Sequence, residues 1–230
     1  SKPSYKHDSK NKGEVEFKNE YIDIHTDKII SLPMVDADLI RSKNFKGVVD
    51  AVNSTGGIAV PNLLDKLGVE VVKLYCEPNG EFPHNPEPLK ENLTDLSNLV
   101  IKEQADFGIV VDPDVDRLAF ICEDGSMFGE EYTLVAVTDY ILQNTPGNTV
   151  SNLSSTQALK DITEKYDCEY NTSAVGEVNV VQKMKETNAV IGGEGNGGII
   201  YPSIHYGRDA LVGVALFLTF LAKKKIKSSE

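Results

Sequence analysis

Short apolar runs that favour β-strands alternate along this chain with longer stretches of helical periodicity. The strand-like runs are 47–52, 69–74, 107–111, 118–122, 149–153, 168–172, 189–191 and 199–201. The helical stretches are 21–32, 93–104, 132–142, 156–166, 178–186 and 208–223, and a further one follows the turn 53–57 and ends near 67. This alternation is typical of α/β proteins, in which each helix returns the chain to the next parallel strand. We expect two consecutive doubly wound α/β domains with mixed, mainly parallel sheets.

The turn-forming segment 144–148 separates two such alternations and is the predicted domain boundary. The prediction is a polar leader over 1–17, a first domain over 18–145 and a second over 146–230. No fixed-period internal repeat is found. The longest apolar run, Ala210–Ala222, is shorter than the roughly 20 residues that span a bilayer, so we predict a buried helix and no membrane contact.

The chain is acidic, with 23 Lys and Arg against 35 Asp and Glu and a formal net charge of −12. This charge argues against nucleic acid as a partner, because phosphate neutralisation needs a cationic face. Anionic substrates can still bind through helix N-termini, a few basic side chains or a metal. The widely spaced Cys76, Cys122 and Cys168 include no Cys-x-x-Cys pair, so we expect buried structural thiols in a cytoplasmic protein.

The sharpest motif is Asp112-Pro113-Asp114-Val115-Asp116-Arg117, directly after the strand-like run 107–111. Three carboxylates at i, i+2 and i+4 converge on one hard cation if the backbone curls, and oxygen ligands favour Mg²⁺ or Ca²⁺. An EF-hand is disfavoured, because Arg117 stands where its turn requires glycine and the flanking runs are strand-like. A solvated acidic turn is the remaining alternative. Arg117 either balances the acidic charge or, as we favour, contacts phosphate.

A second motif is the glycine-rich segment Gly193-Glu194-Gly195-Asn196-Gly197-Gly198. Its glycines allow close approach of the backbone to a ligand, and the Glu carboxylate and Asn amide suit vicinal sugar hydroxyls. An ordinary flexible turn is the alternative. The segment does not fit a dinucleotide-binding fingerprint, and the chain contains no G-x-x-x-x-G-K-[ST] phosphate loop.

Three further features leave two interpretations each. The turn 53–57 between a strand and a helix is expected to cap that helix, although its amides could meet an anion. His84 lies in a proline-stiffened loop, where we expect a structural hydrogen bond rather than a base or a phosphate partner. Arg208 either contacts phosphate or forms a salt bridge with Asp209 or another acid.

In sequence and in order, these loops resemble those of the α-D-phosphohexomutase family, which includes phosphomannomutase/phosphoglucomutase and phosphoglucosamine mutase. The second of that family's four domains carries a D-G-D-x-D-R magnesium loop, similar to 112–117 with Pro113 in place of glycine. The third domain carries a G-E-x-[SN]-G sugar loop, similar to 193–198. The resemblance extends from about residue 20 to the end, so the chain looks like central domains 2 and 3 only.

The resemblance implies a mutase that moves a phosphoryl group between the 1- and 6-positions of a hexose phosphate, through a phosphoserine and a bisphosphorylated intermediate. The resemblance assigns Asp112, Asp114 and Asp116 to Mg²⁺, Arg117 to the phosphate or the loop scaffold, and Glu194 and Asn196 to the sugar hydroxyls. We add Gly195 and Arg208 as further predicted substrate-binding residues. The family's phosphoserine loop and terminal phosphate-binding loop are not found in the sequence. We therefore expect the first and fourth domains to be missing partners and this chain alone to be inactive.

Two other functions fit the acidic motif without the resemblance. One is a Mg²⁺- or Ca²⁺-binding module without catalysis, which would have no reason to bind sugar. The other is a phosphatase with an Asp nucleophile, which would form an aspartyl phosphate on Asp112 or Asp114. The preferred hexose phosphate (glucosamine, mannose or glucose phosphate) and the oligomeric state are not encoded in any motif.

Overall fold

The computed structural model describes residues 16, 18 and 20–230, so the predicted polar leader falls almost wholly outside the described residues. The first half of the chain forms a four-stranded sheet with the strand order β2-β1-β3-β4. Strand β1 is parallel to β2 and β3, whereas β4 is antiparallel to β3. The strands are β1 (Lys46–Asp50), β2 (Glu70–Leu74), β3 (Phe107–Val111) and β4 (Leu118–Cys122).

The second half of the chain forms a second sheet with the order β6-β5-β7-β8. Its first three strands are parallel, and its last strand is again antiparallel to its neighbour. The two sheets therefore share one topology, although the sequence shows no fixed-period repeat. This confirms the predicted class of two α/β domains with mixed, mainly parallel sheets. The strands are β5 (Thr149–Asn152), β6 (Tyr170–Ser173), β7 (Ile191–Gly193) and β8 (Ile199–Ile200).

Helices cover both faces of each sheet because successive strand side chains point to opposite faces. In β1, Val48 packs with the α4 (Thr94–Glu103) cluster, whereas Val49 belongs to the core that contains α3 (Gly56–Lys66). The second sheet is covered on one face by α7 (Glu177–Thr187). The helices α1 (Tyr21–Ile30), α5 (Glu130–Asn144) and α6 (Ala158–Lys165) also contribute to the larger core.

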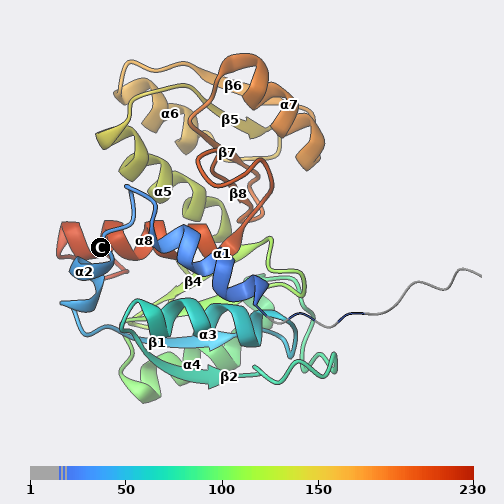
Figure 1. The fold of residues 1–230 in the computed structure, drawn as a ribbon, viewed down its shortest axis with the longest axis vertical. Helices are drawn as coiled ribbons and strands as arrows, with labels where there is room; N and C mark the ends of the chain where they lie inside the picture. Colours follow the sequence, from blue (N-terminus) through green and yellow to red (C-terminus); the bar gives the residue numbers. More distant parts are fainter. Residues whose placement is uncertain (1–15, 17, 19) are drawn as a thin grey trace, which may run out of the picture.

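Helix α8 (Ala210–Lys224) lies between the two sheets (Figure 1). It contacts α1, α2 (Ala37–Arg41), α3 and α5 as well as strands of both sheets. Every residue of α8 except Phe220, Lys223 and Lys224 is buried, as expected for a helix that is apolar all round. Both units therefore share one continuous core, and the predicted buried helix is confirmed. Among the described residues, no helix has the length and apolarity needed to cross a membrane.

The observed elements depart from the predicted ones where the backbone takes a left-handed conformation. Strand β7 begins at Ile191 rather than at 189, because Asn188 (φ 50°) ends α7 and the next amide bonds back to that helix. Asp167 (φ 55°) likewise delays β6 until Tyr170. Helix α2 and the 3₁₀ turn η1 (Lys90–Asn92) were not predicted. All three cysteines were expected to be buried. Cys122 is buried, whereas Cys76 and Cys168 are half-buried.

Candidate metal and substrate site

The acidic motif forms the loop between β3 and β4. Asp112 is buried, and its Oδ1 accepts hydrogen bonds from the backbone N–H groups of Asp116 (3.1 Å) and Arg117 (3.0 Å). These bonds curl the loop, with Val115 in the left-handed region at φ 62°. One carboxylate oxygen from each of Asp112, Asp114 and Asp116 lies within 4.8 Å of the other two. The three carboxylates therefore converge as the spacing predicted.

The electrostatics of this loop fit a hard cation. Burial, together with the charges of Asp116 and Asp114, raises the pKa of Asp112 to about 7. Burial also raises the pKa of Asp116, against the opposing charge of Arg208. Among the described residues, the buried Oδ1 of Asp116 has no hydrogen-bond partner. A divalent cation would neutralise these crowded carboxylates and satisfy the unpaired oxygen.

The turn 53–57 supports this loop instead of capping its own helix. Thr55 is the N-cap residue of α3, but its side chain makes no capping bond. Its Oγ1 donates to the carbonyl oxygen of Pro113 at 3.0 Å, and Ser54 Oγ donates to the carbonyl of Ala51 at 2.8 Å. The expected capping role is therefore wrong, because both hydroxyls are used by other backbone carbonyls.

The glycine-rich motif joins β7 to β8. Glu194 is 4% exposed; its Oε1 accepts from Asn152 Nδ2 (2.8 Å) and from the backbone N–H of Gly176 (3.1 Å). Asn196 is half-buried, and its Oδ1 accepts from the backbone N–H of Gly198 (3.2 Å). Gly197 has φ 87°, and a Cβ there would lie 2.2 Å from the carbonyl oxygen of Leu118. This loop is thus packed against the start of β4.

Arg208 connects the two motifs. Its guanidinium donates to Asp116 of the acidic loop and to Glu194 Oε2 of the glycine-rich loop, the latter at 2.8 Å. Its Nε lies 3.4 Å from Glu177 Oε2. The backbones also meet, since Leu118 N–H donates to the Gly197 carbonyl at 3.2 Å. Of the two interpretations of Arg208, the salt bridge to an acid is therefore present. Its partners are the three acids named above and not Asp209.

Arg117 lies beside the same loop. Its Nε is 3.6 Å from Asp112 Oδ2, and its Nη1 is 3.5 Å from Glu87 Oε1. Among the described residues, the buried Nε has no hydrogen-bond partner. The side chain thus balances the charge of the neighbouring acids.

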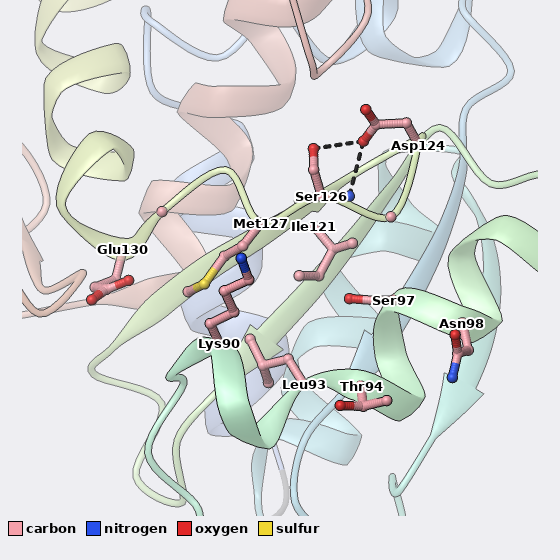
Figure 2. Close-up of a pocket in the computed structure, with 12 residues that line it drawn as sticks. Lys90, Leu93, Thr94, Ser97, Asn98, Ile121, Asp124, Ser126, Met127 and Glu130 are labelled. Atoms are coloured by element: carbon pink, nitrogen blue, oxygen red, sulfur yellow. Dashed lines mark hydrogen bonds between the residues drawn. The ribbon is translucent and has the colours of Figure 1, made fainter.

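A small cavity of about 230 Å³ brings part of both motifs to one surface. Arg117, Gly195 and Asn196 line it together with Ser154 and three glutamates. Glu194, Arg208 and the three aspartates of the acidic loop are not among the residues that line it. A larger cavity of about 800 Å³ shares Glu130 with the small one, and none of the predicted site residues lines it (Figure 2). Its wall includes the turn in which Asp124 accepts from Ser126.

Sequence reasoning missed two residues of the site: Asn152, which donates to Glu194 of the glycine-rich loop, and Glu177, which accepts from the backbone N–H of Arg208 and lies beside its Nε. Asn152 is the last residue of β5 and Glu177 the first of α7. Ligand sites of α/β sheets lie beyond the carboxyl ends of the strands, so the position of Asn152 could have revealed it.

His84 makes the structural hydrogen bonds that the sequence favoured. Its Nε2 lies 2.9 Å from Oδ2 of Asp50, and its Nδ1 lies 2.8 Å from the carbonyl oxygen of Asn85. Asp50 is 1% exposed, and burial raises its pKa. The pair ties the proline-containing loop to the carboxyl end of β1.

These features define a class: a pair of α/β units that share a carboxylate-lined site between two loops. Two family models match, phosphoglucomutase/phosphomannomutase alpha/beta/alpha domain II at residues 20–125 and domain III at 129–230. The chain therefore belongs to the phosphoglucomutase/phosphomannomutase group of α-D-phosphohexomutases, through these two central domains. The first match ends at 125 and the second begins at 129, just before α5. The predicted domain boundary at 145/146, after α5, stays a prediction.

Curated relatives share substantial identity with this chain. The phosphoglucomutase/phosphomannomutase of Thermococcus kodakarensis is 36% identical over 198 residues, which cover 85% of this chain and 43% of the relative. A protein named probable phosphoglucosamine mutase from Methanopyrus kandleri is 32% identical over 220 residues, which cover 95% and 48%. The chain thus spans about half the length of the curated relatives it matches.

A solved structure supports the same fold. A phosphoglucomutase/phosphomannomutase family protein from Burkholderia thailandensis superposes with a TM-score of 0.79 at 28% identity. The match covers 88% of this chain and 44% of that protein.

Proposed function

We propose that this chain supplies the central metal and sugar site of a phosphohexomutase, which moves a phosphoryl group between the 1- and 6-positions of a hexose phosphate. The observation that carries this proposal is the Arg208 bridge, which joins Asp116 of the acidic loop to Glu194 of the glycine-rich loop. A cation and a sugar held by these loops would be neighbours. The names of the relatives support a glucosamine, mannose or glucose phosphate as substrate.

In this proposal, Asp112, Asp114 and Asp116 hold Mg²⁺, because each has an oxygen to offer. Asp112 uses Oδ1 for the backbone and keeps Oδ2, Asp114 is exposed, and Oδ1 of Asp116 has no hydrogen-bond partner among the described residues. Bound Mg²⁺ supplies charge neutralisation for phosphoryl oxygens. The protein's part is to keep three carboxylates fixed and close before the substrate arrives.

The substrate roles follow from which atoms remain free. Arg117 and Asn196 line the 230 Å³ cavity, so we assign phosphate to the guanidinium and a sugar hydroxyl to the amide. Glu194 Oε1 already accepts two hydrogen bonds. Among the residues that the structure describes, Oε2 accepts from Arg208 alone, which leaves one acceptor site for a hydroxyl. We assign Arg208 a positioning role, because the described ion-pair partners of its guanidinium are all acidic side chains.

The test is a titration of this chain with Mg²⁺ and then with glucose 1,6-bisphosphate, followed by backbone amide NMR. We expect Mg²⁺ to shift amides of 112–117 and the bisphosphate to shift those of 193–198. Asp114→Asn should abolish the first response and Asn196→Ala the second. Asp124→Asn, which changes an exposed turn acid, should preserve both.

Other outcomes would identify other functions. A Mg²⁺ response without any sugar-phosphate response would favour a metal module without catalysis. An aspartyl phosphate on Asp112 or Asp114, detected by mass spectrometry after incubation with a phosphate ester, would favour a phosphatase. Multiple turnover of glucose 1-phosphate by this chain alone would contradict the expectation that the chain needs further domains.

A further inference from the structure

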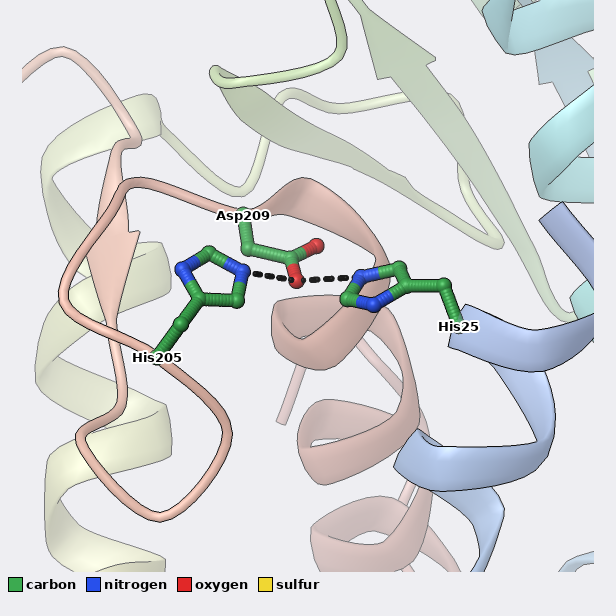
Figure 3. A group of neighbouring side chains, drawn as sticks. All are labelled: His25, His205 and Asp209. Carbon is green, nitrogen blue, oxygen red and sulfur yellow. Dashed lines mark hydrogen bonds and ion pairs between the residues drawn. The ribbon is translucent and has the colours of Figure 1, made fainter. Parts of the chain in front are cut away.

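A second group of potential ligands lies at the start of α8, apart from the acidic loop. His25 comes from α1, His205 from the segment that precedes α8, and Asp209 is the N-cap of α8. The Nε2 atoms of both histidines point at the same oxygen, Asp209 Oδ2, at 2.8 and 3.1 Å (Figure 3). Two imidazoles, one from the distant α1 and one four residues before Asp209, therefore converge on the same carboxylate.

The carboxylate at the centre of this group is held rigidly. Asp209 is 6% exposed, and its Oδ1 accepts from the backbone N–H groups of Leu211 (2.8 Å) and Val212 (3.2 Å). These bonds leave Oδ2 aimed at the histidines. Such outer hydrogen bonds orient the ligating atom in protein metal sites. The His25 and His205 side chains are 32% and 42% exposed, so an ion has access from solvent.

We propose that His25, His205 and Asp209 bind a divalent transition metal and that Zn²⁺ fits best. The three ligand atoms lie within 4.8 Å of one another. Zinc bonds of about 2.0–2.1 Å place tetrahedral ligands about 3.3 Å apart, so the observed spacings need only small adjustments. Imidazole nitrogen selects zinc and similar ions over Mg²⁺, which prefers the all-oxygen acidic loop. Three protein ligands leave the fourth position to water.

Metal binding requires a change of tautomer. Without metal, both Nε2–H groups donate to Oδ2, since a carboxylate can only accept. With metal, each ring binds through the Nε2 lone pair and carries its proton on Nδ1. The ion replaces two hydrogen bonds by three coordinate bonds, and it clamps α1 to the first turn of α8. Because Arg208 directly precedes Asp209, the clamp would steady the bridge between the two loops without occupying their site.

The test uses Co²⁺ as a visible probe for the zinc site, with millimolar Mg²⁺ present to saturate the acidic loop. We expect one equivalent of Co²⁺ to give d–d absorption that Zn²⁺ abolishes by displacement. Loss of a residue that only hydrogen-bonds to a metal ligand weakens metal binding roughly 10–100-fold. His25→Gln and His205→Gln each remove a ligand itself, so each should weaken Co²⁺ binding by more than this. Asp114→Asn and His84→Gln are matched controls that should leave the absorption unchanged. Far-UV circular dichroism checks that each variant is folded.

The proposal is overturned if no Co²⁺ band appears at millimolar metal, or if both histidine variants bind as the parent does. If a variant fails to fold, imidazole ¹⁵N NMR of the parent gives the answer. Zinc should then shift the Nε2 resonances of His25 and His205 and move both protons to Nδ1. Unchanged ring resonances at saturating Zn²⁺ would also overturn the proposal. Neither result depends on whether the chain binds a sugar phosphate.

Discussion

Replacement of Arg208 by Gln tests whether its salt bridges hold the two loops together. The Arg208 side chain is 14% exposed, and its partners Glu194, Asp116 and Glu177 are 5%, 19% and 36% exposed. Arg208→Gln removes the cation and leaves these acids behind. Glu194 has the least access to water, so most of the destabilisation should come from its uncompensated charge.

The expected loss can be worked out from burial. Removal of one partner from a buried ion pair costs about 3–5 kcal/mol, and we take the lower end because Asp116 and Glu177 can recover some hydration. At about 2–4 °C per kcal/mol for a chain of this size, a loss of about 3 kcal/mol lowers Tm by about 6–12 °C. The matched control is Lys160→Gln, because the exposed Lys160–Glu164 pair at 3.7 Å should contribute about 0.5 kcal/mol or less.

The assay is thermal and urea unfolding with and without Mg²⁺. Loss of Arg208 makes the acidic loop more negative, so Mg²⁺ should raise the Tm of Arg208→Gln more than that of the parent. A metal-free Tm within about 2 °C of the parent would refute the buried-pair argument, because one buried pair is expected to contribute more than that. An equal Mg²⁺ response in both proteins would refute the coupling of Arg208 to the metal loop.

Three further changes test other parts of the structure. Burial raises the pKa of Asp112 from 3.8 to about 7. In the absence of a divalent metal, the protonated carboxyl therefore stabilises the folded state at low pH, and this stabilisation is lost as the pH rises from 3.8 to about 7. Asp112→Asn should flatten that fall and abolish the Mg²⁺ response, as measured by urea unfolding at pH 5 and pH 8. Phe217→Ala should cost about 3–5 kcal/mol in urea unfolding, because Phe217 is fully buried and stacks on Phe120 with ring centroids 4.0 Å apart. Gly197→Ala should cost more than about 1 kcal/mol and shift the amide resonances of 112–117 in NMR spectra, because its Cβ would clash with Leu118.

Much of the fold could be predicted because local pattern and tertiary packing agree. The apolar runs 107–111 and 118–122 coincide with β3 and β4, whose residues are all buried. Shifts occur at β6 and β7, where Asp167 and Asn188 adopt left-handed conformations that close the preceding helices. Hydrophobic periodicity does not encode this conformation, so it extended both predicted strands too far back.

The candidate site was predictable in its parts but not in its assembly. Both loops follow from residue type and spacing, since converging carboxylates and clustered glycines restrict what a loop can do. The bridge from Arg208 to Asp116 spans 92 positions in the chain, and no local pattern carries that information. The role of Thr55 was equally hidden, because its hydroxyl bonds to Pro113, 58 positions away, instead of to its own helix.

The shared strand order of the two sheets explains why the loops meet. The acidic loop joins β3 to β4, and the glycine-rich loop joins β7 to β8, so both motifs occupy the same place in two units of like topology. Helix α8 follows β8 and packs against both sheets, and its first residue, Ala210, donates its N–H to the carbonyl of Val115 in the acidic loop at 3.1 Å. The helix that seals the shared core thus also anchors the acidic loop and places Arg208 between the motifs. A core change such as Phe217→Ala should therefore loosen the site as well as the fold, because both depend on how α8 is seated.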